Sequence, residues 1–233
     1  MNASTIKIMD WTKGFSIKSR RLSFGSQSIN LKILAYYLQL EDQFIESIEY
    51  VELDPRNYSA FSNRFAMLIQ AIGAELDTLF KLLCDFDLSA RKNISDYAEQ
   101  ILQHNADIID LKVKLRQFGF EIQPFSGWDS HQAAQSLAWW HAFTDIKHDR
   151  SSHIQDATQY NALNILGALF LLEMLCLKKI SEVTHEPDVY DIRSKLFTLE
   201  NWTAFPETTD DSFRLLGDML DSDSLESSLR FNG

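Results

Sequence analysis

The stretch "FSNRFAMLIQAIGAELDTLFKLLCDF", residues 61–86, decides the fold class of this chain. Its large apolar side chains recur at steps of three and four residues, which is the period of an α-helix with one buried face. The repeat consists of Phe61, Phe65, Leu68, Ile72, Leu76, Leu79, Leu83 and Phe86. The spacing therefore predicts a helix from about Tyr58 to Phe86 that packs one side against a hydrophobic core.

Further helices are expected on either side of this one. Apolar residues at helical spacing run from Leu31 to Tyr50, from Ser95 to Phe118, through residues 139–153 and from Asp156 to Ser181. Residues 118–128, "FGFEIQPFSGW", alternate briefly and then contain proline and glycine, so they predict a connector with a short strand. Only four prolines and eight glycines occur in 233 residues. The sequence thus predicts an all-α bundle of four to five helices.

The charges suggest three parts: a basic N-terminal arm (1–30), the helical bundle (31–183) and an irregular, acidic C-terminal extension (184–233). Residues 1–32 hold six basic side chains against one acid, whereas residues 182–233 hold twelve acids against four basic side chains. The two charged segments are either solvated faces or an arm that lies on the acidic extension; the less favoured alternative is an arm that contacts RNA. We expect the extension to pack on the bundle, because exposing Phe197, Trp202 and Phe205 together would leave an apolar patch.

Composition argues against several classes of function. The net charge of −11 repels nucleic-acid backbones, so non-specific binding to them is not expected. Cys84 and Cys176 each lie in an apolar run. We therefore expect both to be free thiols in the core, as in proteins of the reducing cytosol. The apolar run that starts at Leu163 is short for a bilayer and contains Glu173. We expect a cytoplasmic protein without a membrane span and, lacking glycine-rich nucleotide motifs, without a cofactor.

The segment "WWHAFTDIKHDRSSH", residues 139–153, combines aromatic and polar side chains on one predicted helix. On a helical wheel Trp139, Phe143, Ile146 and Arg150 share one side, and Trp140 lies with Lys147 roughly 90° from it. The opposite side carries His141, Asp145 and His148, whose spacing lets two imidazoles and a carboxylate reach one metal ion. No H-E-x-x-H motif supports a metal site, and a solvated polar face is the alternative.

A second group of polar residues is expected between this helix and the helix at 58–86. Glu75 falls inside the apolar stripe, so its carboxylate needs a cation or other donors, and Arg150 is the expected partner. The pair is either a structural ion pair or part of a polar pocket. The residues assigned to that pocket are Glu75, Trp140, Lys147, His148 and Arg150, with His153 at its rim.

Three segments together resemble a group of bacterial helical proteins. They are residues 57–84, residues 139–150 ("WWHAFTDIKHDR") and residues 156–175 ("DATQYNALNILGALFLLEML"). The group's pattern is an acid-bearing helix, Trp-Trp, Tyr-Asn, Lys-His-x-Arg and an apolar helix; Phe143-Thr144 replace Tyr-Asn here. That group is similar to the HEPN superfamily of four- or five-helix domains. The resemblance covers about Leu31 to Ser181.

The HEPN resemblance implies RNA cleavage in toxin, phage-defence or CRISPR-associated settings, usually by dimers with paired Arg and His residues. In that family an arginine is followed, after four to six residues, by a histidine. Here only Ser151 and Ser152 separate Arg150 from His153, so the family spacing is absent. The catalytic candidates are Arg150 with His148 or His153, because an imidazole can deprotonate a 2′-hydroxyl and a guanidinium can stabilise the phosphorane.

The expected function is that of a HEPN-like bacterial accessory or defence-associated protein that binds RNA or a nucleotide. If it is an enzyme, it is expected to be a metal-independent RNase. The alternative is a non-enzymatic helical interaction protein in which the same residues form a structural ion-pair network. The expected partners are RNA or a nucleotide, a second copy of the chain in a homodimer, or another protein.

Overall fold

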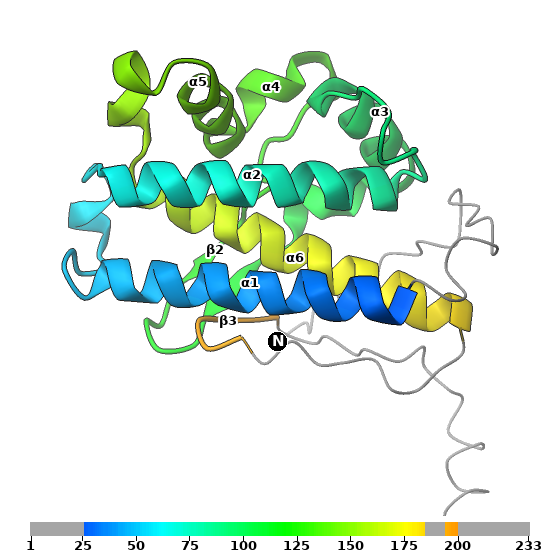
Figure 1. Cartoon of the computed structure of the whole chain (residues 1–233), viewed down its shortest axis with the longest axis horizontal. Coiled ribbons are helices and arrows are strands. Elements are labelled where there is room, and N and C mark those ends of the chain that lie inside the picture. The colour runs from blue at the N-terminus through cyan, green and yellow to red at the C-terminus, as the bar shows by residue number, and fades with distance from the viewer. Residues whose placement is uncertain (1–25, 185–193, 200–233) are drawn as a thin grey trace, which may run out of the picture.

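The computed structural model describes residues 26–184 and 194–199, and the side chains of residues 34–176 and 194–199. These residues form six α-helices and one small sheet, which confirms the predicted helical bundle (Figure 1). The helices are α1 (Ser26–Ile48), α2 (Asn63–Leu83), α3 (Ile94–His104), α4 (Ala133–Ser136), α5 (Ala138–His153) and α6 (Gln159–Thr184). Residues 1–25 and 200–233, which include most of the predicted arm and extension, lie outside the described part.

Helix α2 occupies the middle of the bundle, with α1 and α6 on one side and α5 on the other (Figure 1). It begins at Asn63 because the Ser62 side chain accepts a hydrogen bond from the Phe65 amide at 3.1 Å, which caps the helix. The predicted apolar stripe is buried from Phe65 to Leu83. Phe61 precedes the helix and remains 54% exposed. The stripe is therefore correctly predicted, whereas the helix starts later than expected.

Helix α5 approaches α2 closely at Gly73. A Cβ atom on Gly73 would lie 2.3 Å from the ring of Phe143, so only glycine allows this contact with the ring in its present position. Further along the same interface Trp140 packs against Phe80, with ring centroids 5.9 Å apart. The contact places the C-terminal end of α5 beside the N-terminal end of α2.

Helix α6 is buried on nearly all sides from Ala162 to Leu175. Its window Gln159–Cys176 is long and apolar enough to cross a membrane by length and composition alone, and most of that window is buried inside the fold. Central helices of water-soluble bundles have the same composition, because they have no solvent-facing side. The buried stretch includes one acid, Glu173.

The helix predicted from about Ser95 to Phe118 starts within one residue of its predicted start but ends much earlier than expected. Asn93, not Ser95, caps α3, since its side chain accepts from the amides of Ser95 and Asp96. The helix ends at His104, a 3-10 turn follows at Ala106–Asp110, and the chain then enters strand β1 (Val113–Leu115). Within β1 buried and exposed side chains alternate, which is the two-residue period of a strand.

The sheet has the order β2-β1-β3 and is antiparallel, with β2 at Glu121–Ile122 and β3 at Phe197–Thr198. Strand β2 lies in the predicted connector. Strand β3 belongs to the predicted C-terminal extension, and Phe197 is fully buried against Phe170 at a centroid distance of 5.6 Å. Residues 194–199 thus pack on the bundle. Trp202 and Phe205 lie outside the described residues.

A buried carboxylate holds this segment in place. Glu41 of α1 accepts hydrogen bonds from the hydroxyls of Tyr37 and Ser194 and from the backbone amides of Lys195 and Leu196. The two amide contacts measure 2.9 and 3.2 Å. We call these five residues the Glu41 clasp. Burial, followed by the charge of Glu41, raises the pKa of the Tyr37 hydroxyl well above its ordinary value, so this hydroxyl remains a donor.

Candidate functional site

A kink at Asp149 shapes the C-terminal end of α5. Asp149 has φ −148° and ψ 80°, which lie outside the helical region. Its carboxylate accepts a hydrogen bond from the Ser152 amide at 3.2 Å, as an N-cap residue does. Hydrogen bonds from Ser152 also hold the pKa of the Asp149 carboxyl below its ordinary value. The regular helix thus ends at His148, and Asp149 starts a new short turn.

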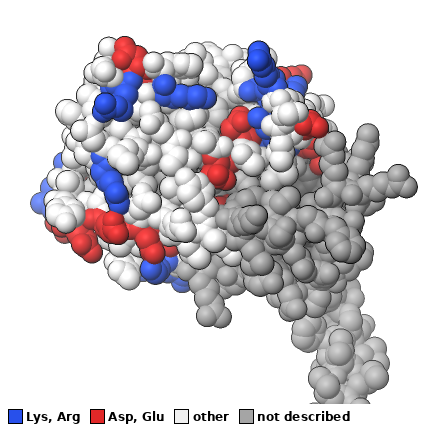
Figure 2. Space-filling model, viewed as in Figure 1, with Lys and Arg blue, Asp and Glu red and all other residues white. Residues whose placement is uncertain are grey.

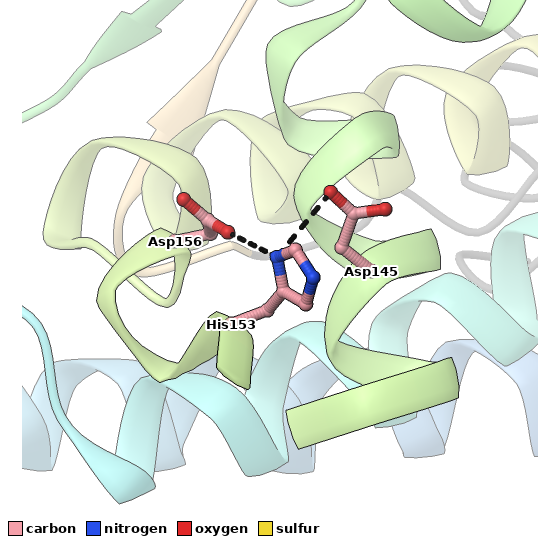
Figure 3. Close-up of side chains that lie close together, drawn as sticks. All are labelled: Asp145, His153 and Asp156. Atoms are coloured by element: carbon pink, nitrogen blue, oxygen red, sulfur yellow. Dashed lines mark hydrogen bonds and ion pairs between the residues drawn. The ribbon is translucent and has the colours of Figure 1, made fainter. Parts of the chain in front are cut away.

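The kink brings four titratable side chains together. His153 Nδ1 lies 3.0 Å from Asp156 Oδ2 and 3.6 Å from Asp145 Oδ2 (Figure 3). His141 Nδ1 lies 3.0 Å from the same oxygen of Asp145. On an uninterrupted helix Asp145 and His153 would be about 12 Å apart along the axis. We call His141, Asp145, His153 and Asp156 the His–Asp cluster.

The His–Asp cluster is half-buried and lies at the surface. The side chains of Asp145, His153 and Asp156 are 26%, 39% and 35% exposed, respectively. In the part of the chain that the structure describes, the ion pairs of Asp145 and Asp156 are with histidines, and no Lys or Arg lies within ion-pair distance of either carboxylate. The cluster is therefore reachable from solvent and carries little compensating positive charge.

The predicted metal ligands are only partly brought together. His141 and Asp145 are adjacent, as the helical spacing predicted, but His148 is exposed and lies outside the cluster. His153 and Asp156 occupy the place that His148 was expected to take. Among the described residues, Asp145, His153 and Asp156 are the group of three whose ligand atoms all lie within 4.8 Å of one another.

The expected contact between Glu75 and Arg150 is absent. The exposed guanidinium of Arg150 donates a hydrogen bond to Asn63 Oδ1 at 2.7 Å, at the first residue of α2. Glu75 is twelve residues further on, or about 18 Å along the helix axis. It also lies roughly 200° around α2 from Gly73, the residue that faces α5. Helical geometry therefore places Glu75 and Arg150 too far apart to line one pocket.

Glu75 instead lies near enough to Glu173 of α6 for its charge to act on that carboxyl. Burial raises the pKa of the Glu173 carboxyl well above its ordinary value, and the nearby charge of Glu75 raises it further. Burial also raises the pKa of Glu75, which is half-buried. The sequence correctly predicted that the Glu75 carboxyl is partly desolvated, but the charged group that interacts with it is another acid.

Trp140 and Lys147, the other two residues assigned to the pocket, have different surroundings. Trp140 is buried and makes edge contacts with Phe80 and Phe143, so it is part of the core. Lys147 is exposed, and its Nζ lies 5.4 Å from the centroid of the Phe143 ring, within the range of a cation–π contact. Neither side chain faces Glu75.

Aromatic side chains border the same end of the bundle. Phe61 pairs with Thr158 through a β-bridge that joins the start of α2 to the start of α6. The rings of Tyr58 and Tyr160 lie 5.3 Å apart, and Tyr160 is 44% exposed. Figure 1 shows the starts of α2 and α6 at the same end of the molecule as the end of α5. Arg150 donates to Asn63, which follows Phe61 by two residues, at this same end of the bundle.

Charges of both signs are scattered over the face shown in Figure 2. On the described part of this face, Lys and Arg occur in small separate groups, with Asp and Glu between them. A long nucleic-acid duplex requires a continuous basic surface, which this face lacks.

Comparison of the chain with protein-family models, curated proteins and solved structures finds no match. Functional inference therefore depends on the chemistry of the residues themselves.

Proposed function

We propose that this chain binds RNA or a nucleotide at the C-terminal end of α5, as the HEPN resemblance implies. The observation that carries the proposal is the short turn after Asp149. This turn presents Arg150 and His153 three residues apart, and Asp156 holds the His153 ring. Residues three apart on a helical turn are neighbours, so both side chains can reach one phosphodiester.

The chemistry of the turn suits a phosphate ester. In the tautomer with Nδ1 protonated, His153 donates a hydrogen bond from Nδ1 to Asp156, which fixes the ring and leaves Nε2, on the far side of the ring, as the proton acceptor. Arg150 uses one nitrogen for Asn63 and keeps other N–H donors of its guanidinium for phosphate oxygens. Of His148 and His153, His153 is the better base, because the Asp156 carboxylate orients its ring, whereas His148 lies outside the His–Asp cluster.

The neighbouring rings favour a single strand or a mononucleotide over a duplex. Exposed aromatic side chains stack on unpaired bases, and Phe61 and Tyr160, at the starts of α2 and α6, are 54% and 44% exposed. The finer parts of the proposal are a HEPN-like arrangement of the bundle, a cytoplasmic location, pairing of two copies and a role as a bacterial accessory or defence-associated protein. They are supported by the sequence resemblance.

The test is RNA binding and cleavage by wild-type protein, Arg150→Ala and His153→Ala, with a mixed single-stranded RNA pool. Arg91→Ala and His131→Ala are matched controls, because both side chains are exposed and lie outside this end of α5. We expect Arg150→Ala to weaken binding about tenfold, and His153→Ala to reduce any cleavage on the order of 100-fold while binding persists. Folded wild-type protein that neither binds nor cleaves RNA would overturn the proposal.

The alternative is a non-enzymatic interaction protein, and one observation favours it. The bond from Arg150 to Asn63 joins α5 to α2, and the bond from His153 to Asp156 joins α5 to the turn before α6. The same side chains can therefore serve only to hold these helices together. That reading predicts that Arg150→Ala and His153→Ala lower the unfolding temperature while the wild-type protein shows no affinity for RNA.

A further inference from the structure

We propose that the His–Asp cluster is a binding site for a divalent transition-metal ion of the Zn²⁺ type. The ligands are Asp145, His153 and Asp156. The inference concerns the same end of the molecule as the proposed RNA site but stands on ligand geometry alone. The two proposals can therefore fail separately.

The spacing of the ligand atoms fits a small coordination sphere. Ligand atoms about 2.1 Å from a tetrahedral zinc ion are roughly 3.4 Å from one another. His153 Nδ1 is 3.0 Å from Asp156 Oδ2 and 3.6 Å from Asp145 Oδ2, which brackets that value. All three ligand atoms lie within 4.8 Å of one another, so a small contraction closes the site around the ion.

The donor set selects the class of metal. Imidazole nitrogen together with carboxylate oxygen suits Zn²⁺ and similar transition-metal ions, whereas Mg²⁺ and Ca²⁺ prefer oxygen alone. His141 Nδ1, at 3.0 Å from Asp145 Oδ2, is an outer contact that orients this carboxylate. One imidazole and two carboxylates supply three protein ligands, which leaves a fourth position for water and favours zinc over magnesium.

The charge of the cluster also calls for a cation. Asp145 contacts the imidazoles of His141 and His153, and Asp156 contacts that of His153; within the described residues neither carboxylate pairs with Lys or Arg. A divalent ion replaces the proton at Nδ1 and offsets both negative charges. It would also remove the repulsion that two carboxylates exert on a phosphate approaching Arg150.

The backbone around the ligands is fixed by other side chains. Asn161 Nδ2 donates to the main-chain carbonyl of Asp156 at 2.9 Å, and the Asn161 amide donates to Thr158 Oγ1 at 3.1 Å. The Asp149 cap fixes the turn that carries His153. Such hydrogen bonds around a site keep the coordinating residues in position and so strengthen metal binding.

The test is titration of the tag-free, full-length protein with Zn²⁺ alone after chelator treatment and buffer exchange, followed by isothermal titration calorimetry. Parallel titrations use Mn²⁺ and Mg²⁺. We expect one zinc ion per chain, bound more tightly than magnesium. We also expect a loss of affinity on the order of tenfold to 100-fold in Asp156→Asn and in His153→Ala. His131→Ala and Asp107→Asn are matched controls, since both residues are exposed and lie outside the cluster.

Circular dichroism shows whether each variant is folded, and Asp145→Asn provides a third ligand variant if one of the others is not. Wild-type protein that binds no zinc would overturn the inference. So would zinc binding of equal affinity in folded wild-type, Asp156→Asn and His153→Ala proteins. RNA binding is measured separately on the chelator-treated protein, so loss of the metal site and loss of the RNA site give different results.

Discussion

Two groups of acids in this molecule illustrate opposite uses of a carboxylate. In the Glu41 clasp, a fully buried carboxylate accepts hydrogen bonds from two hydroxyls and two backbone amides of its own chain. In the His–Asp cluster, half-buried Asp145 and Asp156 have only imidazoles as partners among the described residues. The clasp leaves little capacity for an external ligand, whereas the cluster remains accessible to a cation from solvent.

The difference shows that the burial of an acid, and the number of hydrogen-bond donors around it, indicate whether it stabilises the fold or is available to bind a ligand. A buried acid must be supplied with donors by the fold, because an unsatisfied charge in the core costs several kcal/mol. A surface acid without a basic partner is stabilised by water and can exchange that water for a metal ion. The clasp should therefore matter most for stability, and the cluster most for binding.

The largest effect is expected for Glu41→Ala. The substitution leaves the Tyr37 hydroxyl, the Ser194 hydroxyl and two amides without their shared acceptor, at about 1–3 kcal/mol for each group that stays buried. We expect the free energy of unfolding to fall by about 3 kcal/mol or more, measured by urea denaturation. Segment 194–199 should then become susceptible to limited proteolysis.

The neighbouring residue supplies the control for this experiment. Asp42 pairs with the Lys195 side chain at 2.7 Å, but both side chains are more than half exposed. Asp42→Ala should change the free energy of unfolding by about 1 kcal/mol or less, as surface pairs do. Equal losses in Glu41→Ala and Asp42→Ala would show that the clasp contributes no more than a surface pair.

Much of this fold follows from apolar spacing alone. The stripe on α2 and the apolar run of α6 each predicted a long helix, and both helices form the centre of the bundle. The end of α3 and strand β1 were not predicted, because Ile108, Ile109 and Leu111 fit a helical repeat as well as a turn. The alternation of Lys112, Val113, Lys114 and Leu115 was the available signal for a strand.

The site was predicted less well, for a geometric reason. A helical wheel assumes an unbroken helix, and the kink at Asp149 invalidates it for every later residue. His141 and Asp145 precede the kink, so their pairing was predictable, whereas the approach of His153 and Asp156 was not. The sequence "DRSS" at 149–152 carried the signal, because an aspartate followed by serines is typical of a helix start.

A second, smaller effect concerns pH and the buried acid Glu173. Burial and the charge of Glu75 raise the folded-state pKa of Glu173 above the ordinary value of 4.5. The stability that Glu173 contributes is thus fully present below about pH 4.5 and is lost as the pH rises through the raised pKa. Glu173→Gln removes this loss. We expect the variant to be more stable than wild type by about 1–3 kcal/mol at pH 8 and nearly equal to it at pH 4.5.

The measurement is urea denaturation of wild type and Glu173→Gln at both pH values. Glu99→Gln is the control, because Glu99 is exposed on α3 and should leave the pH dependence unchanged. A Glu173→Gln protein that is less stable than wild type at pH 8 would mean that the ionised carboxylate is held by donors, as in the Glu41 clasp.

The smallest effect is expected for Asp156→Asn in metal-free protein. The bond from His153 Nδ1 to Asp156 Oδ2 is lost, but the two side chains are 39% and 35% exposed, and water can replace each partner. The free energy of unfolding should therefore change by about 1 kcal/mol or less. Zinc at 100 times its dissociation constant should stabilise wild type by about 2.7 kcal/mol, and Asp156→Asn much less at the same concentration. If metal-free Asp156→Asn instead loses about 3 kcal/mol, the His–Asp cluster supports the fold as the Glu41 clasp does. Its function would then be to hold α5 against α6.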